Sequence, residues 1–172
     1  MSEFCNRSAL DRIRDGDSVE LNAGDEERSA IAERLGLISL DRLEAHLTLN
    51  RDGETVTARG RVRAALTQSC VATGEPVPGH IDEPFEIRFV PEPTVAGHGE
   101  EIELGEEDCD IVFHDGAMID IGAAVADTLA LSIDPYPRCA EAEAALKEAG
   151  VLTESEAGPF AALAQLKAGR DS

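Results

Sequence analysis

The chain has 172 residues, an apolar fraction of 42% and a formal net charge of -20. This length suits a single domain, which we predict over residues 1–172. No segment reaches the roughly 20 apolar residues of a membrane span, and the first residues lack the apolar core of a signal peptide. We therefore expect a cytoplasmic protein. Aromatic residues make up only 3% of the chain, which disfavours a base-stacking platform for nucleic acid.

The charge is unevenly distributed along the chain. Residues 1–91 carry 17 acidic residues and 11 arginines, a net charge of -6, whereas residues 92–172 carry 18 acidic and four basic residues, a net charge of -14. Electrostatic binding to nucleic acid needs a local basic surface, so only the first half could supply one.

A strand and a helix are predicted before residue 40. A short strand is expected at 18–21. Asp25 is expected to cap a helix that runs to about Leu35, and Gly36 is expected to end it. Ile31 lies one turn before Leu35, which gives this helix an apolar face.

Three strands with alternating patterns are predicted next. The first alternates polar residues with the apolar residues Leu43, Ala45, Leu47 and Leu49, a period typical of a half-buried strand. A hairpin turn at 50–53 leads to a return strand at about 55–68. Residues 85–89 form the third strand, with its aromatic residues on one face.

Beyond residue 91 the composition changes. Residues 92–110 are rich in Pro, Gly and Glu, which predicts a mobile acidic loop. A short edge strand is expected at 111–113. The pattern then predicts a helix over 119–131, capped by Asp120 and ended by the following prolines.

A C-terminal tail is predicted over residues 150–172, after a short helix at 140–149. A helix in this tail is expected to begin at Pro159. Together the elements predict an α+β fold with an antiparallel sheet, flanking helices and the acidic loop as an interruption. The sequence does not decide whether this sheet closes into a barrel.

The strongest candidate site is a run without Lys or Arg between residues 100 and 115. Its eight acids are Glu100, Glu101, Glu103, Glu106, Glu107, Asp108, Asp110 and Asp115. Such a run attracts cations or basic proteins, although a solvated loop explains it equally well. We predict that its residues from 100 to 110 bind a basic partner.

Two further surfaces are candidates. Arg59, Arg61 and Arg63 share one strand face and could contact RNA phosphates, unless Glu44 or Glu86 pairs with them across the sheet. The tail helix carries an apolar stripe that could either dock on the core or enter a partner's groove. The stripe consists of Phe160, Leu163 and Leu166.

Catalysis and metal binding have little support in the sequence. Cys70 lacks a second cysteine three residues on, and the histidines do not pair at ligand spacing, so we expect no metal and no cofactor. Asp120 and Asp127 fall on one helix face, but a cap and a solvent-facing charge explain them without acid/base chemistry. No catalytic motif is present, and we expect a protein that is not an enzyme.

Three blocks of the sequence, in this order and spacing, resemble the YceD family of large ribosomal RNA subunit accumulation proteins. Residues 27–40 also look like those of alphaproteobacterial members. The blocks are Gln68-Ser69-Cys70 through Pro76 with Phe85–Phe89, then Ile119-Asp120-Ile121 through Pro135-Tyr136-Pro137, and Gly158-Pro159-Phe160 through Lys167.

This resemblance implies a non-catalytic factor that supports 23S ribosomal RNA accumulation and ribosome assembly. Many members carry Cys-x-x-Cys where this chain has Cys70 and Thr73, so any metal site of the family is expected to be lost here. The charge then favours a basic ribosomal protein or the pre-ribosomal large subunit as partner. Direct RNA binding through the arginine strand is the alternative, and no membrane or small-molecule substrate is expected.

Overall fold

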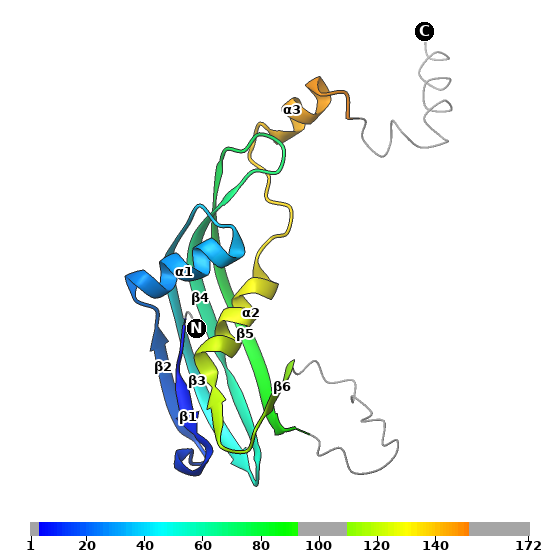
Figure 1. The fold of residues 1–172 in the computed structure, drawn as a ribbon. Coiled ribbons are helices and arrows are strands. Elements are labelled where there is room, and N and C mark those ends of the chain that lie inside the picture. The colour runs from blue at the N-terminus through cyan, green and yellow to red at the C-terminus, as the bar shows by residue number, and fades with distance from the viewer. Residues whose placement is uncertain (1–3, 93–109, 152–172) are drawn as a thin grey trace, which may run out of the picture. The chain divides into compact units, whose positions relative to one another are not determined.

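The computed structural model describes residues 4–92 and 110–151 (Figure 1). The chain divides into two compact units, one formed by Met1–Gln68 and Pro78–Pro135, the other by Ser69–Val77 and Tyr136–Ser172. Most of the expected acidic loop and of the C-terminal tail lies outside the described residues. The single domain over 1–172 stays a prediction.

A five-stranded sheet in the order β2-β3-β4-β5-β6 forms the framework. Its strands are β2 Asp17–Asn22, β3 Ser39–Asp52, β4 Thr55–Ser69, β5 Pro76–Pro91 and β6 Asp110–His114. Strand β3 pairs antiparallel with both β2 and β4, but β6 pairs parallel with β5. The sheet is open, with β2 and β6 at its edges. The α+β class is confirmed. The antiparallel sheet is confirmed in part, because the β5–β6 pair is parallel, and within the described residues the sheet does not close into a barrel.

Two very short strands form a second sheet. Strand β1, Arg7–Ala9, pairs antiparallel with β7, Met118–Asp120, and a 3-10 turn at Leu10–Arg12 follows β1. Three-residue strands carry no readable alternation, so the sequence did not predict this pair. The pairing joins the start of the chain to the entrance of a helix.

Three helices are present in the described residues: α1 Asp25–Leu35, α2 Ile121–Ser132 and α3 Ala142–Glu148. Helix α1 ends at Gly36 in the left-handed conformation, as predicted. Its cap, however, is Gly24 rather than Asp25, and the Glu27 carboxylate accepts a 2.7 Å hydrogen bond from the Gly24 N–H. Helix α2 begins at the expected cap, Asp120.

One face of the sheet is buried under α1, α2 and the small sheet. The alternation predicted for β3 and β4 is confirmed, because the apolar positions are buried and the polar ones face outward. Leu47, Val62, Phe89 and Val125 belong to one apolar cluster. At Gly60 the two strands approach so closely that a Cβ atom would lie 2.1 Å from the His46 carbonyl oxygen.

Strand β5 is much longer than the expected 85–89. It includes Pro76, Pro78 and Pro84, residues that usually disfavour a strand. Strand β6 accompanies it only from Ile87 to Pro91, so within the described residues positions 76–86 have a strand neighbour on one side alone. A flank without a partner is where a strand can accept residues that lack an N–H. The extension includes Asp82, which pairs with arginines of β4.

Candidate functional site

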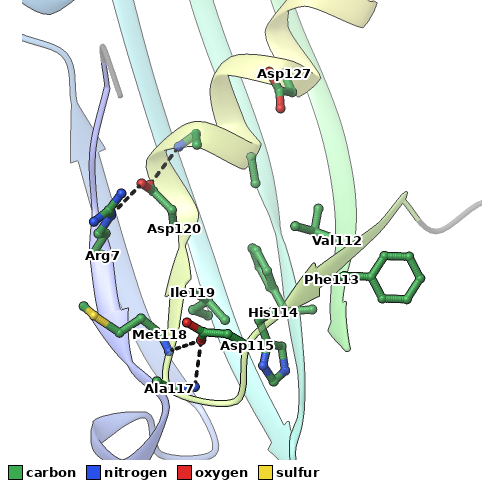
Figure 2. A pocket seen from close by; sticks show the side chains of 13 residues that line it. Arg7, Val112, Phe113, His114, Asp115, Ala117, Met118, Ile119, Asp120 and Asp127 are labelled. Carbon is green, nitrogen blue, oxygen red and sulfur yellow. Dashed lines mark hydrogen bonds and ion pairs between the residues drawn. The ribbon is translucent and has the colours of Figure 1, made fainter. Parts of the chain in front are cut away.

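A groove with a volume of about 500 Å³ lies beside the edge strand β6 (Figure 2). Its lining comes from β1, β6, β7 and the first turns of α2. Three large apolar side chains in this lining stay exposed to solvent: Val112, Phe113 and Met118, at 36%, 54% and 44%. Exposed apolar area of this kind is typical of a contact surface.

Acidic side chains outnumber basic ones around the groove. Asp115, Asp120 and Asp127 line it together with a single arginine, Arg7. The Arg7 Nε lies 3.5 Å from Asp120 Oδ2, and Asp127, which is 70% exposed, lies 3.4 Å from Arg34. The groove therefore combines an apolar lining with a net negative rim.

Asp120 holds the junction between β1, β7 and α2. Its Oδ1 accepts hydrogen bonds from the backbone N–H groups of Ala123, at 3.0 Å, and of Asn6, at 3.2 Å. Burial pushes the pKa of Asp120 upward, but the amide hydrogen bonds together with Cys5 and Arg7 outweigh it and leave the pKa below its usual value. Asp120 is thus a helix cap, as one of the two sequence interpretations held.

The turn between β6 and β7 is held by two neighbouring side chains. Asp115 accepts hydrogen bonds from the N–H groups of Ala117 and Met118, and these bonds lower its pKa. His114 is buried, with Nδ1 accepting from the Gly116 N–H at 3.0 Å. Its Nε2 consequently carries the proton and donates to the carbonyl oxygen of Glu54 at 2.8 Å. The side chains of His114 and Asp115 therefore stabilise the backbone of the turn that borders the groove.

The arginine row lies on the open face of the sheet, as its alternation predicted. Arg59, Arg61 and Arg63 line one shallow depression together with residues of β2 and β3. Each arginine has an acidic partner on β5.

The pairing partners are Glu86 and Asp82. Arg59 Nη2 lies 3.0 Å from Glu86 Oε1, while Asp82 accepts from Arg61 at 2.8 Å and lies 3.5 Å from Arg63. The hydrogen bond from Arg61, with smaller contributions from both arginines, lowers the pKa of Asp82. Pairing with Glu86 was the alternative considered from the sequence, whereas Asp82 was missed because β5 was expected to begin at residue 85.

The remaining predicted site residues lie mostly outside the described residues. This holds for the acids from Glu100 to Asp108 and for the apolar stripe Phe160, Leu163 and Leu166. Within the acid run, Asp110 is exposed at the start of β6 and Asp115 holds the turn between β6 and β7.

The groove itself was not found from the sequence. Its lining joins residues from Arg7 to Asp127, and only the β1–β7 pairing brings them together. The available signal was the apolar run 111–113, which predicts a strand but not that Val112 and Phe113 stay exposed.

The smaller unit brings together side chains that could hold a metal ion. The donor atoms of Glu75, Cys139 and Glu141 lie within 4.8 Å of one another, and both glutamates are exposed. Cys139 also contacts Cys70, with 3.3 Å between the two Sγ atoms. The sequence separation of 69 residues gave no sign of this contact.

Fold and groove together define an α+β protein with an open-faced sheet and an acid-rimmed groove at its edge. A family model described as large ribosomal RNA subunit accumulation protein YceD matches residues 58–167, more than half of the chain. The chain belongs to this family, as its sequence blocks indicated. No curated protein and no solved structure matches it.

Family membership assigns the chain a role in the accumulation of large-subunit ribosomal RNA, and thereby in ribosome biogenesis. Among the described helices, none has the length and apolar character needed to cross a membrane.

Proposed function

We propose that this chain is a non-catalytic ribosome-assembly factor that supports 23S ribosomal RNA accumulation by binding a basic ribosomal protein. The proposal rests on the family match together with the charge of the chain, -20. The partner is either a free ribosomal protein or one already on the pre-ribosomal large subunit. The acids Glu100, Glu101, Glu103, Glu106, Glu107, Asp108 and Asp110 supply much of the attraction.

The observation that carries the choice of partner is the pairing of the arginine row. Arg59, Arg61 and Arg63 share two carboxylates on β5, so the densest positive charge of the sheet is largely neutralised in place. A phosphate backbone would have to displace Asp82 and Glu86 before it met these guanidinium groups. A cationic protein segment would instead be attracted by the excess of acidic residues in the chain, whose net charge is -20.

The groove beside β6 adds a second contact for the same partner. Lysine and arginine side chains combine an apolar stem with a charged tip. The exposed Val112 can cover such a stem, and the carboxylates of Asp115 and Asp127 belong to the same lining. Phe113 lies on the opposite face of β6 and points away from the groove (Figure 2). The side chains of His114 and Asp120 already form hydrogen bonds with backbone groups, so we expect this groove to bind a partner rather than to transfer protons.

The test is a titration of the full chain with a purified, lysine- and arginine-rich protein of the large subunit, followed by fluorescence anisotropy. We expect binding that weakens steeply with salt, because surface charges are screened beyond about 8 Å at physiological ionic strength. Replacing the seven acids from Glu100 to Asp110 by their amides should abolish most of this salt dependence. Unchanged binding by that variant would refute the acidic run as the contact.

A second variant tests the groove. Val112→Ser should weaken binding of the same ribosomal protein, whereas Ile38→Ser, at another exposed apolar residue, should not. Equal effects of the two changes would remove the groove from the proposal.

Direct RNA binding through Arg59, Arg61 and Arg63 is the second candidate function. Affinity capture at low and moderate salt, with and without RNase, separates the two. Recovery of ribosomal proteins that resists RNase supports the leading proposal, and recovery that RNase abolishes supports the RNA alternative.

A further inference from the structure

Two cysteines lie in contact within the smaller unit. Cys70 lies in the segment Ser69–Val77 and Cys139 in the segment from Tyr136, and their Sγ atoms are 3.3 Å apart. The Cys139 N–H donates to Cys70 Sγ at 3.3 Å, and the Val71 N–H donates to the Pro137 carbonyl at 2.9 Å. Backbone contacts therefore hold the two sulfur atoms in register.

The two thiols differ in exposure and in protonation. Cys70 is 3% exposed, whereas Cys139 is half-buried. The hydrogen bond from the Cys139 amide and that from Thr73 lower the pKa of Cys70 to about 6. Thr73 pulls the pKa of Cys139 down as well, but the neighbouring Cys70 sulfur and burial leave it above its usual value. Cys139 Sγ donates a hydrogen bond to Cys70 Sγ, so the more exposed thiol already faces the buried sulfur.

We propose that Cys70 and Cys139 form a redox modification site, which a peroxide converts into an intramolecular disulfide. Closing the bond requires the sulfur atoms to approach from 3.3 Å to about 2.05 Å. This shift is small because the two segments are already joined by the backbone hydrogen bond from Val71 to Pro137 and by the hydrogen bond from the Cys139 N–H to Cys70 Sγ. The site is independent of the ribosomal role proposed for the chain.

The chemistry proceeds in two steps. The more accessible Cys139 passes its proton along the hydrogen bond to Cys70, and its thiolate attacks one oxygen of hydrogen peroxide. The O–O bond breaks, hydroxide leaves, and Cys139 becomes a sulfenic acid. Cys70 then gives its proton to hydroxide, forming water, and its thiolate attacks the sulfenic sulfur with loss of a second hydroxide. The two sulfur atoms together lose two electrons, which the peroxide accepts.

The surroundings favour a neutral oxidant. Donor oxygens of Glu75 and Glu141 lie within 4.8 Å of Cys139 Sγ and place negative charge at the accessible thiol. Such charge repels anionic disulfides such as oxidised glutathione but not hydrogen peroxide. The same groups suggest the competing possibility of a metal site, which the experiment distinguishes.

The test uses the reduced full chain, treated with hydrogen peroxide in the presence of a chelator, then blocked with an alkylating reagent, digested and examined by mass spectrometry. We expect Cys70 and Cys139 to lose their free thiols together and to appear as one cross-linked peptide pair. At micromolar protein this link should exceed intermolecular cross-links by about a thousandfold, because the paired thiol has a millimolar or higher effective concentration.

Matched variants assign the two roles. In alkaline buffer, which supplies the Cys139 thiolate that Cys70 no longer generates, Cys70→Ser should retain a sulfenic acid on Cys139, because the resolving sulfur is gone. A dimedone probe detects this sulfenic acid. Cys5→Ser is the control, since Cys5 is exposed and hydrogen-bonded to Asp120 rather than to a sulfur, and it should form the Cys70–Cys139 link as readily as the unaltered chain.

Two results would overturn the proposal. One is that Cys70 and Cys139 stay alkylatable at peroxide doses that oxidise Cys5. The other is stoichiometric metal in the purified chain that Cys70→Ser and Cys139→Ser both remove, which would make the pair a ligand set. The first result is measured on the unaltered chain, so it does not depend on the folding of any variant.

Discussion

The arginine face of the sheet and the groove beside β6 use charge in opposite ways. On the arginine face every guanidinium group of the row has a carboxylate opposite it on β5, so a basic sequence pattern gives a nearly neutral surface. In the groove the three carboxylates outnumber their two arginine partners, Arg7 and Arg34, and apolar side chains beside them remain exposed. The sign of a surface is therefore decided by cross-strand neighbours rather than by the residues of one strand.

The largest effect is expected from Gly122→Ala, in the first turn of α2. A Cβ atom at this position would lie 2.4 Å from the Phe4 carbonyl oxygen and 2.8 Å from the Asn6 nitrogen. The segment before β1 must move away from α2, at a cost of about 1–3 kcal/mol of the free energy of unfolding. Chemical denaturation measures this loss.

Gly79→Ala is the matched control for that change. Its Cβ would meet only the end of the Leu66 side chain, at 3.3 Å, which can shift. Equal destabilisation by both substitutions would show that the close approach at Gly122 is not special.

A pH-dependent effect is expected at Asp120. Because its folded-state pKa is lowered, Asp120 contributes stability that is present above its unfolded pKa of about 3.9 and is lost as pH falls through the folded value. Asp120→Ala should cost about 1 kcal/mol at neutral pH through loss of the helix cap. Asp120→Asn should keep much of the cap and lose the acid dependence.

Unfolding curves at pH 7 and below pH 4 provide the measurement. The difference between the unaltered chain and Asp120→Asn should shrink as the pH falls. A difference that grew instead would mean that the carboxylate is not the stabilising form.

Freeing the arginine row should make the open face of the sheet behave as a basic surface. Asp82→Asn with Glu86→Gln removes the carboxylates that pair with Arg59, Arg61 and Arg63. We expect tighter binding to single-stranded RNA, with a salt dependence steeper by about 0.7 for each further phosphate that the freed arginines neutralise. Filter binding across a salt series measures both quantities.

The control is Asp41→Asn with Glu83→Gln, which makes the same change of charge at exposed positions away from the ion pairs of this row. If it raised RNA affinity as much as the first variant, net charge rather than unpairing would be responsible.

The smallest effect is expected for the ion pair itself. A double-mutant cycle of Arg59→Ala and Glu86→Ala should give a coupling of about 0.2–1 kcal/mol, because the arginine side chain is 62% exposed and solvent screens the interaction. Thermal unfolding of the four proteins measures it. A coupling well above this range would mean that the face is a rigid, desolvated network.

Sequence patterns predicted those parts of the fold that repeat locally. The alternation of 43–49 and the four-residue recurrence of Ile121, Val125 and Leu129 each result from one face being buried, and both are confirmed. The β1–β7 pairing joins residues more than a hundred positions apart, such as Arg7 and Asp120, and leaves no periodic signal.

The same limit applies to the candidate sites. The arginine row was visible as a pattern, but its neutralisation depends on Asp82, whose place in the sheet is set by a strand that tolerates prolines. The contact between Cys70 and Cys139 joins two segments that are 69 residues apart. The local pattern of either segment contains no information about the other, so the contact could not be predicted.

The prolines of β5 have a consequence for how copies of this protein meet one another. Pro76, Pro78 and Pro84 lie in the stretch of β5 that lacks β6 as a neighbour. They are separated by even numbers of residues, so all three belong to the same side of the alternating strand. Successive peptide groups point to opposite sides of a strand, so the missing N–H donors belong to a single flank. A strand from a second molecule cannot complete a ladder along such a flank. The prolines therefore oppose edge-to-edge pairing of two copies of this protein along β5.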